Sequence, residues 1–399
     1  MTPTTIAIAF IAAPSAMLGY AYIGYPILLA AVTRKRAPNA EQETDGSQWP
    51  SLTITVPVYN EERNLAEVLE ALLGQDYPAA KRHVLVVSDA STDRTDEIAR
   101  SFASRGVELL RLPDRRGKTA AENAADVAAR GEIIVNTDAT VRLLPSSLST
   151  LVRAFEDPSV GVASGRDVSV GAEDTQANRG ESGYVGYEMW VRRLETRFHS
   201  IVGASGCFYA TRRHLYDGAF PEGLSRDFAS ALIARRRGYR AVSVEDALCR
   251  VPRTSSLRSE FRRKVRTMAR GLQTLWYMRS LMNPLRYGRF AFCLVSHKLC
   301  RWLVSLFLPL AVVGVLMLGP SQPLARLAIV GLIAASAAAL VAMRWPERRR
   351  VPAALALPAF GVASFAAGFV AWMRALSGQA SAVWEPTRRS APATTNRPS

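Results

Sequence analysis

Five charged side chains in the first 140 residues of the chain could bind a metal ion and a diphosphate. They stand in short polar segments next to apolar runs: Glu61, Asp89, Arg116, Lys118 and Asp138. Oxygen ligands of this kind suit a divalent cation, and Arg and Lys suit phosphate oxygens. Together they predict a site for a nucleotide diphosphate and its metal ion.

Two common phosphate-binding motifs are absent from the sequence. No G-x-G-x-x-G follows the first apolar run, and no G-x-x-x-x-G-K-[ST] occurs anywhere in the sequence. Their glycines let backbone N–H groups cradle phosphates, and Arg116-Gly117-Lys118 is too short to replace them. The sequence therefore argues against a dinucleotide-binding fold and against a P-loop.

The elements that must position these residues form a repeating strand–helix pattern. Strands are predicted for four apolar runs: Leu52–Val58, His83–Val87, Val107–Leu112 and Glu132–Val135. Leucine and valine recur at helical spacing between Leu65 and Leu73, after the first of them. This alternation predicts an α/β fold with a mostly parallel, doubly wound sheet. The polar loops then meet at the sheet edge where such folds bind ligands.

Two later segments could contribute to the same edge. Small residues in the segment VGASGC permit close backbone approach to a ligand or to another strand. Asp227 stands at a predicted helix start, where an aspartate usually acts as a cap. From Ser255 a basic amphipathic helix follows, which could lie on a membrane, and its arginines could also hold a diphosphate.

Apolar residues are concentrated at the two ends of the 399-residue chain. The first stretch, Ile6–Val32, lacks the basic start of a signal peptide and is followed by Arg34-Lys35-Arg36. It therefore predicts a retained membrane anchor with its basic end in the cytoplasm. Three further stretches approach the length of about 20 residues that spans a bilayer core: 302–319, 324–343 and 351–373. If all four cross, the loop Arg344–Arg350 is cytoplasmic and both termini are extracytoplasmic.

The net charge of +16 indicates an anionic partner. Much of the excess lies beside the apolar stretches or in Arg258–Arg270, and no nucleic-acid recognition motif is visible. Anionic lipid and phosphate substrates explain it better than nucleic acid. The four cysteines lack C-x-x-C spacing and are predicted to be reduced thiols that form neither a disulfide nor a zinc site.

Seven motifs in order resemble the membrane-bound branch of the family 2 glycosyltransferases, which includes chitin-oligosaccharide, hyaluronan, poly-N-acetylglucosamine and cellulose synthases. They are VPVYNEE, SDASTD, RRGK, NTDAT, SGCFYATRRHL, SRDF and the arginine-rich segment after Ser255. The resemblance covers Pro50 to about Trp302 and the flanking apolar stretches. It implies a GT-A domain, Rossmann-like with a mostly parallel sheet, between N-terminal and C-terminal transmembrane helices.

That resemblance divides the chain into six parts and assigns roles to eight residues. The parts are a transmembrane anchor (1–36), a linker (37–50), the GT-A domain (51–252), basic amphipathic interface helices (253–300), about three transmembrane helices (301–375) and a polar tail (376–399). Pro57, Tyr59 and Glu61 match the first nucleotide-contacting loop, and Asp89 matches the aspartate that contacts the base. Lys118 matches the basic loop near the donor, and Asp138 matches the first aspartate of the D-x-D motif that binds Mg²⁺ or Mn²⁺. Asp227 matches the catalytic base, and Arg266 matches the arginine of Q-x-x-R-W.

The chain departs from the family pattern at four positions. Thr140 replaces the second D-x-D carboxylate, which leaves the metal dependence open. Arg226 stands before the catalytic aspartate in place of an acid. Arg263 and Thr267 replace the glutamine and tryptophan of Q-x-x-R-W, which argues against processive polymerisation.

The resemblance implies an inverting transfer of sugar from a nucleotide-sugar, most simply a UDP-sugar, in cell-surface or exopolysaccharide synthesis. The acceptor would be a glycan or a lipid-linked glycan, and the enzyme would be a multi-pass protein of the inner membrane with a cytoplasmic catalytic domain. Polysaccharide export or assembly proteins are possible partners. Two alternatives stay open: transfer to a polyprenyl phosphate, and a catalytically silent scaffold in an assembly complex.

Overall fold

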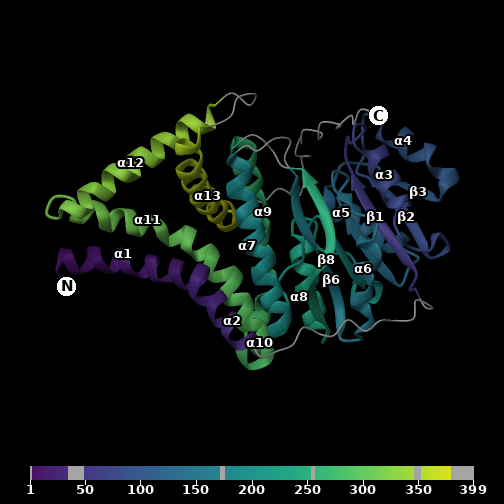
Figure 1. Cartoon of the computed structure of the whole chain (residues 1–399), viewed down its shortest axis with the longest axis horizontal. Coiled ribbons are helices and arrows are strands. Elements are labelled where there is room, and N and C mark those ends of the chain that lie inside the picture. Colours follow the sequence, from purple (N-terminus) through teal and green to yellow (C-terminus); the bar gives the residue numbers. More distant parts are fainter. Residues whose placement is uncertain (1, 35–48, 171–175, 253–256, 346–351, 379–399) are drawn as a thin grey trace, which may run out of the picture.

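The computed structural model describes residues 2–34, 49–170, 176–252, 257–345 and 352–378. Most of the predicted linker (37–50), of the loop Arg344–Arg350 and of the polar tail (376–399) lies outside these ranges. A sheet domain occupies one side of the molecule, and long helices extend away from it on the other (Figure 1).

The first half of the sheet has the predicted parallel order. Its strands are β1 (Leu52–Val58), β2 (Arg82–Ser88), β3 (Val107–Arg111) and β4 (Ile133–Thr137). They lie side by side as β3-β2-β1-β4, and all three pairings are parallel. The carboxyl ends of β1, β2 and β4 therefore meet at one edge, as the repeating pattern predicted.

The second half of the sheet adds two antiparallel strands to the predicted mostly parallel arrangement, so the sheet is mixed. Four more strands follow: β5 (Arg142–Leu143), β6 (Val160–Val170), β7 (Phe208–Arg212) and β8 (Arg240–Pro252). β7 is antiparallel to both β4 and β6, and β5 is antiparallel to β8, while β6 and β8 are parallel. The sheet is mixed because the chain enters β7 beside the carboxyl end of β4, where Phe208 pairs with Thr137, and must run back across the sheet.

Helices cover both faces of the sheet. On one face α3 (Leu65–Leu73), α4 (Thr95–Ser101) and α6 (Ser147–Arg153) share an apolar core with β1, β4 and β6. On the other, α5 (Lys118–Ala128) packs on β2, and α8 (Arg226–Arg236) packs near β6 and β7. Because their apolar side chains are buried against the sheet, the helices are held on its two faces. Their first residues therefore lie at the sheet edge.

Three helices connect this domain to the apolar helices: α7 (Gln176–Phe198), α9 (Leu257–Tyr277) and α10 (Pro284–Leu294). α10 continues through the π-helical segment η7 (Val295–Cys300) into α11 (Arg301–Leu318). The part of the chain predicted to lie at the interface thus leads directly into an apolar helix.

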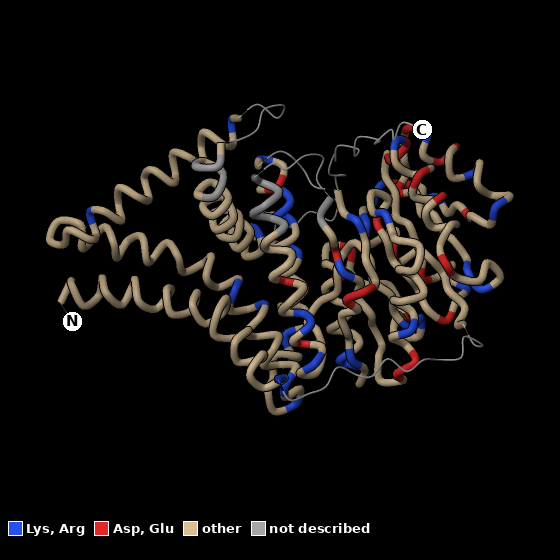
Figure 2. Tube along the Cα trace, viewed as in Figure 1, with Lys and Arg blue, Asp and Glu red and all other residues tan. Residues whose placement is uncertain are grey.

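Four helical stretches in the described residues are long and apolar enough to cross a membrane: Pro3–Thr33, Pro284–Leu318, Pro323–Met343 and Pro358–Leu376. The first comprises α1 (Pro3–Gly19), the π-helical segment η1 (Tyr20–Gly24) and α2 (Tyr25–Thr33), and the last two lie in α12 (Pro323–Met343) and α13 (Ala353–Leu376). Figure 2 shows that α1, α11 and α12 are almost free of charged residues, whereas Asp and Glu gather in the sheet domain and α7.

α13 lies lengthwise against α9 instead of beside the full length of α11. Lys264 of α9 donates to Ser364 Oγ at 2.7 Å and lies over the Phe360 ring. The start of α13 packs on the end of α12, and near its own end Trp372 Nε1 donates to the carbonyl of Trp302, at the start of α11, at 2.8 Å.

A buried cluster of charged groups joins the sheet domain to the apolar helices. This joint cluster consists of Glu188 and Glu195 of α7, His297 of η7 and Arg301 of α11. Arg301 Nη1 donates to Glu188 Oε2 at 2.8 Å, and His297 Nδ1 lies 2.6 Å from Glu195 Oε1. Tyr25 of α2 donates to Glu195 Oε1 at 2.7 Å. Three segments distant in the sequence are thereby held together.

Candidate active site at the sheet edge

The ends of β1 and β2 turn sharply at the edge of the sheet. Asn60 and Ala90 adopt positive φ angles of 54° and 57°. Such angles are uncommon for residues other than glycine, and they concentrate at functional sites. Asn60 Oδ1 accepts from Thr92 N at 2.8 Å, so each turn holds the other in place.

The three residues predicted for the first nucleotide-contacting loop lie together there. Pro57 is buried within β1. The guanidinium of Arg115 lies 3.8 Å above the ring of Tyr59. Glu61 is 5% exposed, its N–H donates to Thr95 Oγ1 at 2.8 Å, and its Oε2 accepts from Asn64. These hydrogen bonds hold the loop in place. The ring of Tyr59 and the guanidinium of Arg115 stack on each other at the sheet edge.

Asp89 shapes the neighbouring basic turn. Its Oδ1 accepts from Arg116 N at 2.7 Å and its Oδ2 accepts from Gly117 N at 2.8 Å. Gly117 has a φ of 101°, which favours glycine, and it directly precedes α5. Asp89 thus fixes where α5 starts and where Lys118 stands, and the contact with a base implied by the resemblance stays a prediction.

Lys118 and Asp138 meet at the edge. Lys118 Nζ lies 2.6 Å from Asp138 Oδ1 and donates to the carbonyl of Gly206 at 2.9 Å. Asp138 directly follows β4, and its N–H donates to the carbonyl of Cys207. Although burial opposes the ammonium charge, Asp138, Glu122 and Asp227 raise the pKa of Lys118 above its ordinary value. Lys118 therefore stays cationic at neutral pH.

Asp227 reaches the same place from the second half of the sheet. Its Oδ1 accepts from Ser225 Oγ at 2.5 Å and from Phe228 N at 2.8 Å, which orients the carboxylate at the start of α8. Its Oδ2 would lie 2.5 Å from a Cβ atom placed at Gly206, so any other residue there would displace the Asp227 carboxylate. Lys118, Asp138 and Asp227, named here the sheet-edge cluster, therefore converge on the backbone of Gly206.

The sequence analysis missed Glu122, which lies beneath the sheet-edge cluster. It is 2% exposed, one helical turn after Lys118, and its Oε1 lies 3.9 Å from Lys118 Nζ. Burial raises the pKa of Glu122 to about 7, even though Lys118 and Arg226 act in the opposite direction. The spacing of Glu122 from Lys118 was visible in the sequence, but its burial was not.

Arg270 is a second residue that the sequence analysis did not single out. It lies one turn after Arg266 on α9, donates to Thr119 Oγ1 at 2.7 Å and also donates to the carbonyl of Leu224. Arg270 therefore connects α9 to the start of α5 and to the segment before Asp227. Arg266 is partly buried on the same helix, and its predicted contact with the donor stays a prediction.

The residues at this edge fit a metal ion held largely by substrate oxygens. No group of three or more His, Cys, Asp or Glu side chains that could hold a metal occurs among the described residues. Asp138 supplies one carboxylate, and Thr140 stands two residues later. Mg²⁺ is commonly bound through one or two carboxylates plus substrate phosphates, so a single aspartate is compatible with such an ion.

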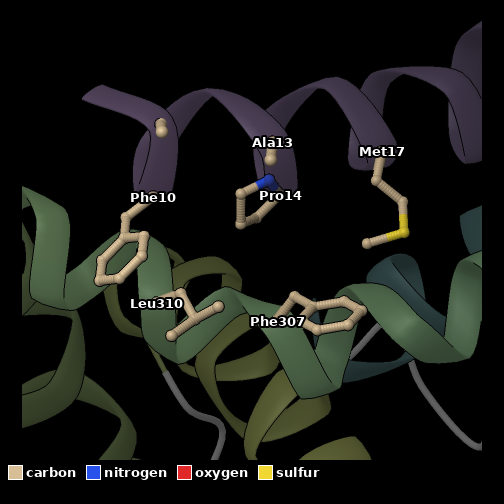
Figure 3. Close-up of a pocket in the computed structure, with 7 residues that line it drawn as sticks. Phe10, Ala13, Pro14, Met17, Phe307 and Leu310 are labelled. Atoms are coloured by element: carbon tan, nitrogen blue, oxygen red, sulfur yellow. The ribbon is translucent and has the colours of Figure 1, made fainter. Parts of the chain in front are cut away.

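A hollow of about 320 Å³ lies elsewhere, between α1 and α11 (Figure 3). Its lining is apolar and includes Phe10, Pro14, Met17, Phe307 and Leu310. Without a charged or nucleophilic side chain, it offers no group for acid–base chemistry. This hollow is therefore not a candidate for the reaction.

Sequence comparisons relate most of the sheet domain to a known family. Residues 53–220 match the family model described as glycosyl transferase family 2. An N-acetylglucosaminyltransferase of Bradyrhizobium elkanii is 31% identical over 164 residues, which are 40% of this chain and 90% of that relative. An N-acetylglucosaminyltransferase of Bradyrhizobium diazoefficiens is 29% identical over 238 residues, 54% of this chain and 48% of that relative. The chain spans about half the length of several of the curated relatives it matches.

A solved structure has the same fold. The mannosyltransferase PcManGT from Pyrobaculum calidifontis, in complex with GDP-Man and Mn²⁺, superposes with a TM-score of 0.70. The match covers 95% of this chain and 100% of that one, at 24% sequence identity. The likeness therefore extends over the apolar helices as well as the sheet domain.

Proposed function

The chain belongs to glycosyl transferase family 2, and on that premise we propose that it moves a sugar from a nucleotide-sugar to an acceptor hydroxyl with inversion at the anomeric carbon. The observation that carries this proposal is the convergence of Lys118, Asp138 and Asp227 on Gly206. It brings an ammonium and two carboxylates to one edge of the sheet, to which the proposal assigns the roles of cation, metal ligand and base.

In the proposed reaction Asp227 is the general base. Its carboxylate takes the proton of the acceptor hydroxyl while that oxygen forms a bond to the anomeric carbon. The bond between this carbon and the diphosphate oxygen breaks, and the nucleoside diphosphate leaves. A general base in position contributes about 10² to 10⁴ in rate. The hydrogen bonds from Ser225 and Phe228 support this role because they fix the direction of the carboxylate.

Lys118 would neutralise the charge that develops on the departing diphosphate. Its ammonium is preorganised by Asp138 and by the carbonyl of Gly206, so little reorganisation is needed when charge develops. A divalent ion bound at Asp138 would supply further charge neutralisation. The face formed by Tyr59 and Arg115 is placed to accept the nucleoside.

The printed activities of the relatives suggest which donors to test. Several are named N-acetylglucosaminyltransferase, so UDP-N-acetylglucosamine is the first candidate donor. PcManGT was solved with GDP-Man, so GDP-mannose is the second. The proposed acceptor is a glycan or a lipid-linked glycan of the cell surface, in keeping with the apolar helices beside the sheet domain.

We further propose that the protein is a multi-pass inner-membrane protein whose sheet domain is cytoplasmic. The basic residues after α2 and α12 support this orientation. The packing of α13 favours three crossings over the four predicted. The start of α13 contacts the end of α12, and the end of α13 contacts the start of α11. Because the end of α12 and the start of α11 lie at the same membrane face, α13 does not cross the membrane. In this arrangement α9 and α13 lie together along the cytoplasmic surface.

The membrane arrangement can be tested by labelling single cysteines in a cysteine-free variant with a membrane-impermeant maleimide. Ser377→Cys, just after α13, should react only in inverted vesicles, whereas Ser321→Cys, between α11 and α12, should react in intact cells after outer-membrane permeabilisation. Labelling of Ser377→Cys from outside would instead support four crossings.

The proposed activity is tested by nucleotide release. Detergent-solubilised protein is incubated with a panel of UDP- and GDP-sugars, membrane lipid extract and either Mg²⁺, Mn²⁺ or EDTA. Release of nucleoside diphosphate from one donor, with transfer of its sugar to the extract, supports the proposal. No release from any donor contradicts it and favours the silent scaffold.

A further inference from the structure

Arg226, the residue before Asp227, has the most deeply buried guanidinium near the sheet edge in the described structure. Its side chain is 1% exposed, and it is among the largest fully buried side chains there. A buried guanidinium is costly unless carboxylates and hydrogen bonds compensate for the lost water. The partners of Arg226 therefore indicate why a cation stands at this position.

Its partners lie on α5, the helix that begins with Lys118. Arg226 Nη1 donates to Asn123 Oδ1 at 2.6 Å, and Nη2 donates to Asp126 Oδ2. The guanidinium also lies 3.9 Å above the ring of Tyr216. Arg226 thus connects the first turn of α8 to the second and third turns of α5.

Asn123 extends the connection to the segment before α8. Its Oδ1 also accepts from Phe220 N at 3.0 Å, and its Nδ2 donates to the carbonyl of Phe220 at 2.7 Å. A displacement of Arg226 would therefore shift α5, the 220–224 segment and α8 together.

Apolar packing also contributes to holding α8 on the sheet. Ala229, Leu232 and Ile233 of this helix are buried among apolar neighbours. Apolar packing is weakly directional, whereas a guanidinium that donates to two side chains of α5 restricts both distance and angle. Arg226 therefore fixes the position of the first turn of α8, the turn that carries the candidate base Asp227, relative to α5.

We propose that Arg226 is a positioning residue that sets the separation of the Asp227 carboxylate and the Lys118 ammonium. Because both groups take their roles from the proposed function, the inference rests on it. Arg226 itself is buried and does not touch the substrate. It acts by holding the start of α8 against α5, so that the distance between the base and the cation is fixed.

Two variants test this role. Arg226→Lys keeps the positive charge but loses the two guanidinium nitrogens that donate to Asn123 and Asp126. Asp126→Asn keeps the shape of the partner side chain but removes its negative charge. The matched control is Arg237→Lys, just after the same helix, where Arg237 pairs with Asp217, whose side chain is 77% exposed. For each variant, kcat, the donor KM and the melting temperature are measured on the same preparation.

The inference predicts a loss in kcat that is separate from donor binding and from stability. Arg226→Lys should lower kcat by about tenfold or more while the donor KM changes by less than about threefold, because misplacement affects the transition state most. Asp126→Asn should lower kcat in the same way, and the double variant should be no worse than the worse single one, because both changes break one connection. Arg237→Lys should behave as wild type.

Three results separate the outcomes. A folded Arg226→Lys protein with kcat within about twofold of wild type overturns the inference. If Arg226→Lys does not fold, the isosteric Asp126→Asn variant decides alone, and an unchanged kcat overturns the inference there. Absence of turnover in the wild-type protein with every donor contradicts the proposed function, whereas an active wild type with unaffected variants contradicts only the role of Arg226.

Discussion

The joint cluster and the sheet-edge cluster of the described residues both combine charged groups from distant segments, and they differ in accessibility. In the joint cluster, the side chains of Glu195, His297 and Arg301 are at most 4% exposed, and that of Glu188 is 11% exposed. In the sheet-edge cluster, the side chains of Lys118 and Asp138 are 18% and 20% exposed and border the side-chain-free Gly206. The closed cluster holds elements together, whereas the more exposed side chains of the sheet-edge cluster are accessible to a substrate.

Loss of the Lys118 ammonium should have the largest effect on turnover. We expect Lys118→Met to lower kcat/KM by about 10³-fold, since removal of a preorganised group that stabilises developing charge has effects of this size. Steady-state nucleotide release measures the change, and the melting temperature shows whether the variant is folded. Wild-type turnover in a folded Lys118→Met protein would mean that the sheet-edge cluster is not the reactive one.

Loss of a carboxylate in the joint cluster should affect stability and leave turnover nearly unchanged. Glu188→Gln leaves Arg301, Lys298 and His297 without that charge partner and should cost about 3 kcal/mol of unfolding free energy. Thermal unfolding in detergent measures it. If the folded variant instead loses most of its kcat at an unchanged melting temperature, the joint cluster takes part in the reaction.

Glu122→Gln should make the protein more stable at alkaline pH. The pKa of Glu122 is raised from 4.5 to about 7 in the folded protein, so the folded state holds a proton that the unfolded state releases between these values. The unfolding free energy therefore falls as pH rises from about 4.5 to about 7 and stays lower above it. Gln does not ionise, so above pH 7 the variant should gain up to about 3 kcal/mol.

The pH dependence distinguishes this effect from ordinary repacking. Melting temperatures of wild type and Glu122→Gln should differ at pH 8 and approach each other near pH 5. An equal difference at both pH values would show that ionisation of Glu122 does not cause it. A carboxyl whose pKa is raised by burial beside charged groups is a feature that concentrates at functional sites.

Removal of divalent cations should lower turnover less than loss of the Lys118 ammonium does. Asp138 offers a single carboxylate, and Lys118 already supplies a positive charge beside it. We expect chelation to lower kcat by about tenfold, with recovery on addition of Mg²⁺ or Mn²⁺. Complete loss of turnover on chelation would assign most of the charge neutralisation to the metal ion instead of Lys118.

The sequence predicted the first half of the sheet because its pattern is local. The apolar runs that became β1 to β4 and the helical spacing after β1 are visible within short windows, and parallel pairing then brings Glu61, Asp89 and Asp138 to one edge. Asp227 was singled out through the family resemblance, since by itself an aspartate at a helix start suggests only a cap.

The remaining features depend on contacts between distant segments. The reversed direction of β7 follows from where the chain enters the sheet, and the placement of α13 follows from its packing on α9. Glu122, Arg226 and Arg270 were not predicted as site residues because a charged residue in a helix looks the same in the sequence whether it is buried or exposed.

The comparison of the two clusters is tested most directly by Asp227→Asn, with Asp217→Asn as the matched control on an exposed carboxylate. Nucleotide release with the best donor and the melting temperature are measured for both proteins. The proposed mechanism predicts that Asp227→Asn melts near the wild-type temperature and loses at least about 10²-fold in kcat, while Asp217→Asn retains both. A folded Asp227→Asn protein with wild-type turnover would contradict the assignment of the sheet-edge cluster as the catalytic site.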